Sequence, residues 1–364
     1  MGDQQRTLAD HTNVPSAHGF YALPVSAIVE ETPDTRTFVF DVPEALRDHF
    51  TYRPGQFCTV RASIGGDDVL RCYSMSSAPG VDADLAVTVK RVAGGVMSNW
   101  LHDHVAVGDA LELTRPAGVF CPTDTELPVL GFGGGSGLTP IFSIVKHILA
   151  NTERSVKLLV ANRDIESVIF HDELARLQAE HRARLELLHH LDADGGYLDT
   201  DAVARFAEGS VDAEVFVCGP TPFMDLVEHA LVGAGVAPAR IAIERFVAGG
   251  PSAEPRPATA ERAATDGVDG DVTETLTLVL KGKKSVVEYV PGDTVLDTAR
   301  RAGLKPPFSC ELGNCASCMA FVSEGNATMR ANHALTAAEV DEGWVLTCQA
   351  QPTGRTVTVV YENL

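Results

Sequence analysis

The sequence contains no apolar run long enough to cross a membrane, and it is poor in basic residues. No stretch approaches the roughly 18 apolar residues that a membrane span needs, and the first twenty, MGDQQRTLADHTNVPSAHGF, lack the apolar core of a secretion signal. Lys and Arg number 29 against 49 acidic residues, which gives a net charge of −20. Nucleic acids and anionic membranes repel such a chain. We therefore expect a cytoplasmic protein that has neither as a partner.

The rest of the composition is ordinary for a soluble globular protein. Hydrophobic residues make up 45% and charged residues 21% of a chain of 364 residues, which is enough for two or three domains of about 150 residues each. Disulfides are rare in a reducing cytoplasm. The eight cysteines are therefore not expected to form disulfides, and a cluster of cysteines in such a protein is expected to bind metal or take part in catalysis.

Residues 18–125 are predicted to form a small antiparallel β-barrel. Short β-rich segments, bounded by Gly, Pro and Asp, recur through this part of the chain. These segments are TRTFVFDV (35–42), QFCTVRA (56–62), LAVTVKRV (85–92) and ALELTRP (110–116).

From 126 to 247 strands alternate with helices, which predicts a doubly wound parallel sheet. Residues 248–274 are rich in Ala, Pro and Gly and have no periodicity, so they are expected to be a linker. Residues 275–364 are predicted to form a small α+β domain with a hairpin, a helix, a cysteine loop and a final strand. The predicted fold is thus multidomain.

The cysteine loop CELGNCASC contains Cys310, Cys315 and Cys318, and Cys348 follows after 29 intervening residues. Plant-type [2Fe–2S] ferredoxins use the spacing C-x4-C-x2-C…C, in which four thiolates hold two irons. Structural zinc sites usually have two short cysteine pairs, and here there is only one. A redox-active C-x-x-C is expected near a βαβ unit, which is absent locally. The spacing therefore favours a [2Fe–2S] cluster.

The segment before Cys348, LTAAEVDEGWVLTCQAQP, is similar to the tail of plant-type ferredoxins, in which a helix precedes the fourth cysteine. Thr336 and Glu339 form a capping box that would start this helix. One departure stands out, because many relatives carry Arg after the first cysteine and this chain has Glu311. A carboxylate there is expected to lower the cluster potential and to change the docking charge.

A [2Fe–2S] centre takes one electron at a time, whereas nicotinamides deliver hydride, so a flavin is expected between them. In RCYS (71–74), Arg71 can grip a pyrophosphate, Tyr73 can pack on the ring, and the Ser74 hydroxyl can reach the flavin edge. By itself this tetrapeptide is more typical of a strand end with a structural Tyr. In VKRVAGGVMSNWL (89–101), two glycines precede a helix whose N-terminus favours phosphate.

Two further segments are candidates for the nicotinamide. GFGGGSGLTP (131–140) follows a strand and opens a helix, although Ser136 stands where the dinucleotide fingerprint requires its third glycine. CGPTPFM (218–224) begins with Cys218, which would otherwise be a small buried residue at a strand end. IERF (243–246) then ends the domain.

Together these motifs resemble the ferredoxin–NADP⁺ reductase superfamily, and the domain order resembles that of single-chain oxygenase reductases with a C-terminal ferredoxin. The resemblance implies FAD, a [2Fe–2S] cluster and NAD(P)H. It implies catalytic roles for Ser74, Cys218 and Glu244 and cluster ligation by the four cysteines. It assigns to FAD Arg71, Tyr73, Ser74, Val89, Lys90, Gly95, Val96, Met97, Ser98 and Phe246, and to the nicotinamide cofactor Gly133, Gly134, Gly135, Gly137, Thr139, Arg163, Cys218, Gly219 and Pro220.

The motifs RCYSM, AVTVKR, SNWLHDH and CGPTPFM are similar to those of reductase components of 3-ketosteroid 9α-hydroxylases. The expected function is to pass electrons from NADH through FAD and the cluster to a separate terminal oxygenase of the Rieske type. Reductase subunits of phenylacetyl-CoA epoxidases or of other ring and alkyl hydroxylases are the alternative. A redox sensor without turnover is a more distant one.

The choice between NADH and NADPH depends on the residues after the second strand of the parallel sheet. An acidic residue there favours the ribose 2′-hydroxyl and an Arg favours a 2′-phosphate, and the chain offers both, as Arg163 and Asp164. The steroid resemblance favours NADH. His102, His104, His189 and His190 are expected at the surface or at an interface, because no pairing with two cysteines suggests a Rieske centre.

Overall fold

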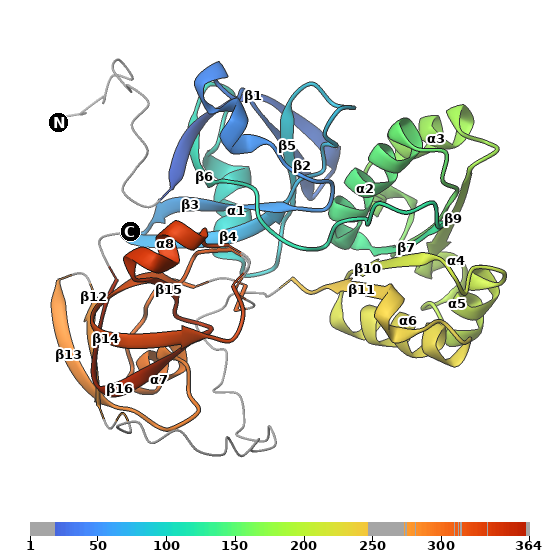
Figure 1. The fold of residues 1–364 in the computed structure, drawn as a ribbon. Helices are drawn as coiled ribbons and strands as arrows, with labels where there is room; N and C mark the ends of the chain where they lie inside the picture. The colour runs from blue at the N-terminus through green and yellow to red at the C-terminus, as the bar shows by residue number, and fades with distance from the viewer. Residues whose placement is uncertain are drawn as a thin grey trace.

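The computed structural model describes residues 19–246 and 273–361, apart from residues 274, 281, 309, 312, 314 and 333. These parts form three units in chain order (Figure 1). Except for Thr273, the predicted linker at 248–274 lies outside the described residues. None of the described helices is long and apolar enough to span a membrane.

The first unit is an antiparallel sheet of order β4-β3-β6-β1-β2-β5. A bridge between Met75 and Val87 brings the end of β4 back to β5, so the sheet curls into a barrel. The predicted strands are present, and the structure adds β1 and β4, which were not predicted as separate strands. The elements are β1 (Phe20–Thr32), β2 (Thr35–Phe40), a 3₁₀ helix (Glu44–Phe50), β3 (Phe57–Ile64), β4 (Asp67–Ser74), β5 (Leu85–Lys90), α1 (Val96–His104) and β6 (Ala110–Thr114).

The neighbouring strands β3 and β4 have one face in the barrel core and one face outside it. Side chains alternate along a strand, and Cys58 and Val60 of β3 point into the core. Thr59 points the other way, and its antiparallel partner on β4 is Cys72. The outer face of this strand pair therefore presents Thr59 and Cys72 together.

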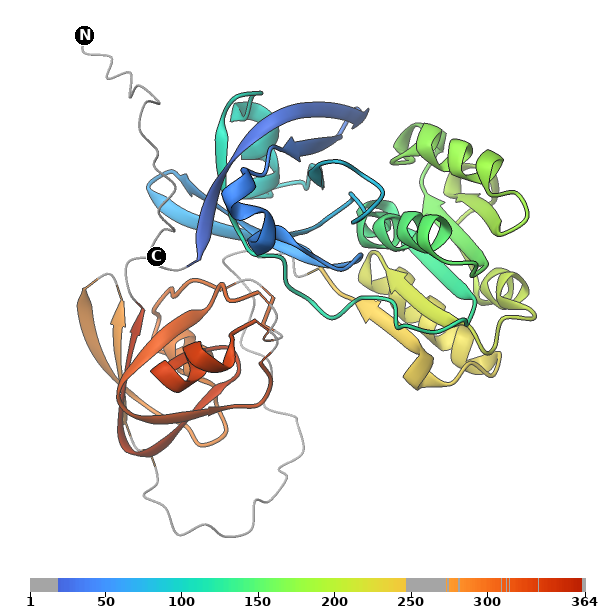
Figure 2. The same cartoon turned by 45° about the horizontal axis from the view of Figure 1, so that its top comes forward.

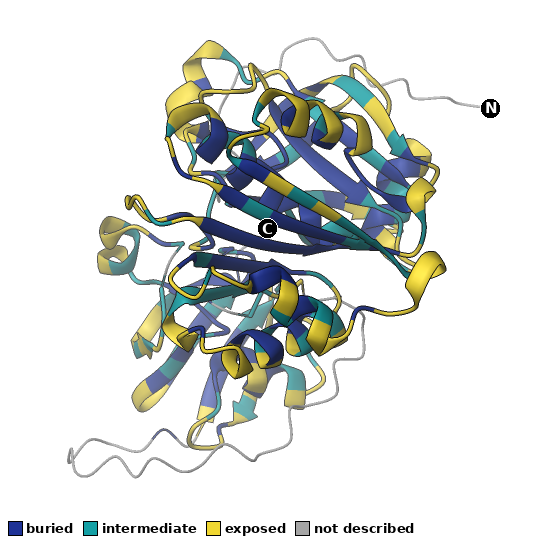
Figure 3. Ribbon diagram, turned by 90° about the vertical axis from the view of Figure 1, so that its right-hand side faces the viewer, coloured by how far each residue is buried: buried dark blue, intermediate teal, exposed yellow. Residues whose placement is uncertain are grey.

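The second unit is a parallel sheet of order β11-β10-β7-β8-β9. Its central strand β7 is buried along its whole length, as expected for a parallel strand covered on both faces. Helices α2 and α3 pack on one face and α5 and α6 on the other, with exposed outer sides (Figure 3). The elements are β7 (Val129–Gly134), α2 (Leu138–Asn151), β8 (Val156–Asn162), α3 (His171–Glu180), β9 (Leu185–Leu191), α4 (Asp192–Gly195), α5 (Thr200–Ala207), β10 (Glu214–Cys218), α6 (Thr221–Gly233) and β11 (Ile241–Glu244).

The third unit is a mixed sheet of order β13-β12-β16-β14-β15, in which β12 and β16 are parallel. Helix α7 packs on its core through Val295 and Ala299. The predicted capping box of Thr336 and Glu339 is confirmed at the start of α8. The elements are β12 (Thr275–Leu280), β13 (Lys283–Glu288), α7 (Val295–Arg301), β14 (Met319–Met329), α8 (Ala337–Glu342), β15 (Trp344–Leu346) and β16 (Ala350–Tyr361).

The third unit lies next to the β3–β4 side of the barrel in both views (Figures 1 and 2). Arg115, just after β6, forms an ion pair with Glu339 of α8 over 3.5 Å. The barrel, the doubly wound sheet and the small α+β unit confirm the predicted fold class.

Candidate redox site

Three residues that are far apart in the sequence meet at the edge where the barrel joins the parallel sheet. At the carboxyl end of β10, Cys218 pairs with Gly133 of β7 on one side and with Glu244 of β11 on the other. Ser74, the last residue of β4, donates its hydroxyl hydrogen to the Glu244 carboxylate over 3.3 Å. Ligands of open parallel sheets bind at this edge. The structure therefore brings together the three residues predicted to be catalytic.

The electrostatics of this site favour uncharged side chains at neutral pH. Loss of hydration raises the pKa of Glu244 to about 8, and the hydrogen bond from Ser74 offsets this only in part. Burial, and then the nearby Glu244 charge, hold the pKa of the Cys218 thiol well above its usual value. A thiol reacts as its thiolate, so Cys218 is a poor nucleophile here. The site can position a ligand but offers no acid–base pair.

The two predicted nicotinamide segments lie in direct backbone contact. A Cβ atom added to Gly137 would lie 2.3 Å from the carbonyl oxygen of Cys218, and one added to Gly219 would lie 2.7 Å from the Phe223 ring. Only glycine fits at both positions. Gly135 has a φ of +53° and its missing side chain would point into open space, so its backbone remains approachable. The glycines thus serve packing as well as ligand access.

Other predicted nicotinamide residues have structural contacts of their own. Thr139 is buried and donates its hydroxyl hydrogen to the carbonyl of Ser136 over 3.0 Å. The Asp164 carboxylate accepts from the Ser167 amide over 2.9 Å and caps the short helix that follows β8. Arg163 is exposed beside it. The carboxylate of Asp164, which could bind the ribose, is therefore already hydrogen-bonded as a helix cap, whereas Arg163 is exposed to solvent.

The predicted flavin segments lie on the barrel next to this edge. Arg71 and Tyr73 occupy one face of β4 and Ser74 the other, because side chains alternate along a strand. Helix α1 begins after Gly95 without a side-chain cap, which leaves its N-terminal amides to a phosphate. A Cβ atom at Gly95 would lie 2.6 Å from the Ser98 hydroxyl. These features fit the pyrophosphate of FAD.

Two residues assigned to the flavin have more restricted positions. Val89 points into the barrel core with no exposed surface, and its carbonyl accepts from His102 over 2.8 Å. Because its side chain is buried and its carbonyl is already bonded, Val89 could contact a ligand only through the other atoms of its main chain. Lys90 pairs with Asp34 over 3.6 Å. Of the others, Met97 is buried, whereas Val96 and Phe246 are largely exposed.

The four predicted cluster cysteines converge in the third unit as two pairs. Hydrogen bonds link the side chains of Cys310 and Cys315 and those of Cys318 and Cys348. The amide of Cys310 also points at the Cys315 sulfur over 3.4 Å. No three His, Cys, Asp or Glu side chains of the described residues surround a single metal ion. Two thiols for each of two irons is the arrangement that a [2Fe–2S] cluster requires.

The backbone of the cysteine loop turns tightly around this position. Gly313 has a φ of +77°, and a Cβ atom there would lie 2.9 Å from the carbonyl oxygen of Ala331. Glu311 also has a positive φ of +54°. Its carboxylate is held by both terminal nitrogens of Arg300, over 2.8 and 2.9 Å. The charge expected to act on the cluster and on docking therefore has a counter-charge beside it.

The cysteine loop is also in contact with the barrel, which was not predicted from the sequence. Thr59 of β3 donates its hydroxyl hydrogen to the carbonyl of Cys315 over 3.3 Å. Ser317 donates to the Thr59 hydroxyl over 3.5 Å, and Cys72 of β4 shares a hydrogen bond with the Cys315 side chain. Single Thr, Ser and Cys residues carry no spacing signal, so nothing in the sequence could have identified them.

Comparison with known proteins agrees with this geometry. The chain matches the family models for an oxidoreductase FAD-binding domain at 22–121, an oxidoreductase NAD-binding domain at 132–229 and a 2Fe-2S iron-sulfur cluster binding domain at 278–353. It is 41% identical to the ferredoxin reductase component of 3-ketosteroid-9-alpha-monooxygenase from Rhodococcus rhodochrous, over 94% of this chain and 97% of that protein.

This chain belongs to the family of oxygenase reductases with FAD-binding, NAD-binding and [2Fe–2S] domains. Another relative is a 1,2-phenylacetyl-CoA epoxidase subunit from Escherichia coli, 31% identical over 94% of this chain and 98% of that protein. The fold is that of phthalate dioxygenase reductase, with a TM-score of 0.58 at 24% identity, covering 95% of this chain and 99% of that chain. The reductase is an NAD(P)H-dependent oxidoreductase, and its cofactors are FAD and a [2Fe–2S] cluster.

One histidine of the reductase does not lie where it was predicted. His102 is buried, not at the surface, and its Nε2 bonds to the carbonyl of Val89 over 2.8 Å. Its ring packs edge-on against Phe38 in the barrel. The expectation was wrong for His102 because α1 turns this face onto β2 and β5. His104 is exposed and stacks on Trp100.

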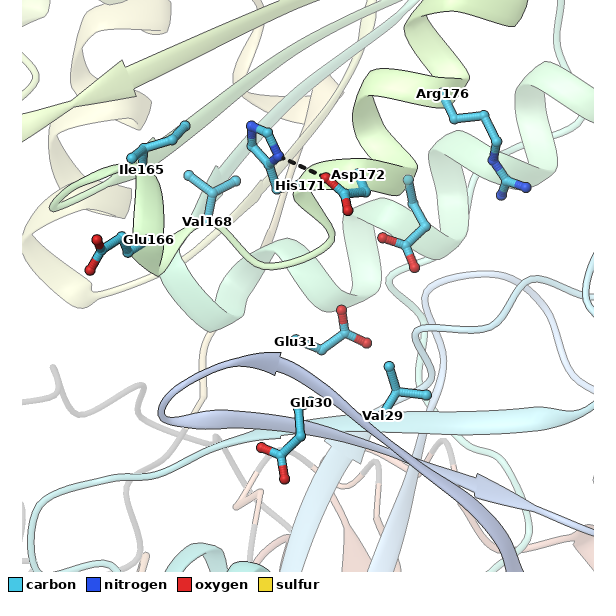
Figure 4. A pocket seen from close by; sticks show the side chains of 10 residues that line it. Val29, Glu30, Glu31, Ile165, Glu166, Val168, His171, Asp172 and Arg176 are labelled. Carbon is cyan, nitrogen blue, oxygen red and sulfur yellow. Dashed lines mark hydrogen bonds and ion pairs between the residues drawn. The ribbon is translucent and has the colours of Figure 1, made fainter.

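A cavity of about 580 Å³ lies between β1 and α3, away from the site of the reductase described above (Figure 4). None of the residues predicted to bind FAD or the nicotinamide lines it. Five carboxylates face it against one Arg and one His, so it would repel a nucleotide phosphate. The residues that line it are Val29, Glu30, Glu31, Ile165, Glu166, Val168, His171, Asp172, Glu173 and Arg176.

Proposed function

We propose that this reductase takes hydride from NADH onto FAD and delivers the electrons singly, through its [2Fe–2S] cluster, to a terminal oxygenase that hydroxylates a 3-ketosteroid. The observation that carries the electron path is the placement of Cys72 and Ser74 on the same face of β4. Ser74 reaches the hydride site through Glu244, and Cys72 reaches the cluster ligand Cys315. Two residues of a strand span about 7 Å, so one strand links both redox sites.

The proposed residue roles combine the family resemblance with the positions described above. Ser74, Cys218 and Glu244 position the nicotinamide and the flavin edge for hydride transfer. Arg71, Lys90 and the amides at the start of α1 hold the FAD phosphates, with Tyr73 and Phe246 against the ring system. Bound FAD supplies two-electron acceptance and one-electron release. The chain itself contributes orientation and exclusion of water, with no proton transfer between side chains.

Support for the steroid assignment comes from the relative of Rhodococcus rhodochrous, which is more similar than the epoxidase subunit of Escherichia coli. The latter supports the alternative, a reductase subunit of a phenylacetyl-CoA epoxidase or another hydroxylase. We further propose a Rieske-type terminal oxygenase as acceptor. The substrate of the oxygenase is proposed to bind in a pocket of the oxygenase itself, so the residues of this chain do not select it.

The partner is proposed to dock on the side of the cysteine loop that faces away from the barrel. On the barrel side Cys315 and Ser317 are buried, whereas Cys310 and Glu311 are partly exposed. The chain carries a net charge of −20, so a basic patch on the oxygenase would steer the encounter and make it sensitive to salt.

The test uses two electron acceptors and one ligand variant. NADH should drive steady reduction of cytochrome c by the purified holoprotein. Cys315→Ser should abolish that activity and leave NADH–ferricyanide activity intact, because ferricyanide can take electrons from the flavin. Purification without flavin would contradict the proposal. Capture of the oxygenase from source cells, followed by NADH-driven turnover of a 3-ketosteroid or of phenylacetyl-CoA, separates the two substrate assignments.

A further inference from the structure

The contact between the cysteine loop and strand β4 joins two units that the sequence separates by more than two hundred residues. We propose that the Cys72 thiol of the flavin barrel donates a hydrogen bond to the cluster-ligand sulfur of Cys315, and that this bond raises the reduction potential of the cluster while the ferredoxin unit is docked. The inference rests on the proposed function, because it concerns the chain with its cluster bound.

The contact is a small, buried polar cluster. Cys72 and Thr59 are opposite each other on β4 and β3, and the Thr59 hydroxyl lies 3.4 Å from the Cys72 sulfur. Thr59 has no exposed surface, and Ser317 and Cys315 have 1% and 3%. Cys72 itself is partly exposed, but these buried neighbours shield its bond with Cys315 from water on their side, which strengthens the bond electrostatically.

The direction of the bond follows from counting hydrogens. The Thr59 hydroxyl has one hydrogen, which it donates to the Cys315 carbonyl, and it accepts from Ser317. A sulfur bound to iron has lost its proton and can only accept. Cys72 must then be the donor in its bond with Cys315, and its single hydrogen is assigned to the negatively charged sulfur in preference to the neutral Thr59 hydroxyl, which lies 3.4 Å away. A bond from a neutral thiol to a negatively charged sulfur is charge-assisted.

The effect on the potential follows from where the charge goes. With the cluster bound and reduced by one electron, negative charge on the ligand sulfurs would increase, and the hydrogen bond from Cys72 would become stronger. The reduced cluster is stabilised relative to the oxidised one, and hydrogen bonds to the sulfurs are a known determinant of cluster potential. The thiol proton stays on Cys72 throughout. The bond thus favours electron entry on the side facing Ser74.

The test compares the holoprotein with Cys72→Ala and Cys72→Ser. Cys72→Ala should lower the equilibrium constant for electron transfer from flavin to cluster about tenfold, which is 59 mV for a one-electron couple. An EPR-monitored redox titration measures this. Electron–nuclear double resonance of the reduced cluster, recorded in H₂O and in D₂O, identifies couplings to exchangeable protons. Cys72→Ala should show one such coupling fewer than the wild type. Cys72→Ser keeps a donor and should restore the coupling and most of the potential.

Cys121→Ser is the matched control, since this barrel cysteine lies on another segment and its thiol faces the carbonyl of Gly118. The reduction potential of the cluster in Cys121→Ser should equal that of the wild type. If alanine prevents cofactor loading, Cys72→Val tests the same point, because valine fills a similar volume in a strand without a donor. An unchanged potential and an unchanged proton coupling on loss of the thiol would overturn the inference. Failure of the proposed function looks different, as a chain that does not pass electrons from NADH to cytochrome c.

Discussion

The hydroxyl of Ser74 donates a hydrogen bond to the Glu244 carboxylate over 3.3 Å, and so joins the last residue of β4 in the barrel to the last residue of β11 in the parallel sheet. Because Glu244 pairs with Cys218 on the neighbouring strand, the bond fixes the barrel against the row of residues proposed to receive the nicotinamide. The hydride site therefore exists only where the two units meet.

Ser74→Ala should lower kcat for NADH–ferricyanide reduction at least tenfold, with FAD content unchanged. The loss reflects misplacement of the reacting groups, and each factor of ten corresponds to about 1.4 kcal/mol in the barrier. Stopped-flow measurement of flavin reduction by NADH is the direct check. Ser63→Ala, at an exposed position of β3, serves as control and should behave as the wild type. A Ser74→Ala variant with wild-type flavin reduction would remove Ser74 from the site.

The raised pKa of Glu244 predicts a specific dependence of stability on pH. In the unfolded chain the carboxyl ionises near its ordinary pKa of 4.5, whereas in the folded protein it stays protonated up to about 8. Stability from the neutral carboxyl is fully present below pH 4.5 and is lost as the pH rises to about 8. The melting temperature of the wild type should therefore fall relative to that of Glu244→Gln, which cannot ionise, as the pH rises from 5.5 to 8.5. A constant difference across this range would contradict the assigned pKa.

Gly137→Ala should destabilise the nicotinamide-binding edge. The added Cβ atom would lie 2.3 Å from the carbonyl oxygen of Cys218, so the two loops must separate, at a cost of roughly 1–3 kcal/mol. Urea unfolding should show the loss, and KM for NADH should rise. Gly195→Ala is the matched control, because its Cβ atom would meet open space. Equal stability of the two variants would mean that the loops are not packed as described.

The ion pair of Arg300 and Glu311 predicts opposite effects of its two partners on the cluster. Glu311→Gln leaves the positive charge of Arg300 unpaired beside the cluster loop and should raise the cluster potential. Arg300→Gln should lower it, because an unpaired negative charge then lies beside the cluster loop. Both side chains are partly exposed, so unfolding free energies should change by about 1 kcal/mol or less. Shifts of the same sign for Glu311→Gln and Arg300→Gln in redox titrations would refute the compensation.

Because the chain resembles the reductase components of 3-ketosteroid 9α-hydroxylases, NADH is expected to be the better substrate, with a higher kcat/KM than NADPH. Arg163 is exposed after β8, and the Asp164 carboxylate is engaged as a cap, so any use of NADPH should depend on Arg163. Arg163→Ala should lower kcat/KM for NADPH more than for NADH, because only NADPH presents a 2′-phosphate. Equal kcat/KM values for the two cofactors in the wild type would refute the preference.

The kinds of sites in this protein are encoded locally along the chain. The spacing of Cys310, Cys315, Cys318 and Cys348 identifies a two-iron cluster, because ligand number and loop length are local properties of the chain. The alternation of strands and helices after residue 126 likewise indicates a parallel sheet, and the capping box at Thr336 marks a helix start that the structure confirms. Each of these signals lies within a short window of residues.

How the sites are joined depends instead on tertiary packing. The bond of Ser74 to Glu244 spans 170 positions, and the contact of Thr59 with Cys315 spans 256. The burial of His102 and the pairing of Glu311 with Arg300 likewise depend on which faces pack together. Strand register and unit docking are set by packing over the whole molecule, so no local pattern encodes them. The sequence thus determines that the cysteine loop is a cluster site, and the fold determines that one side of this loop is held against β4, where we propose that electrons enter.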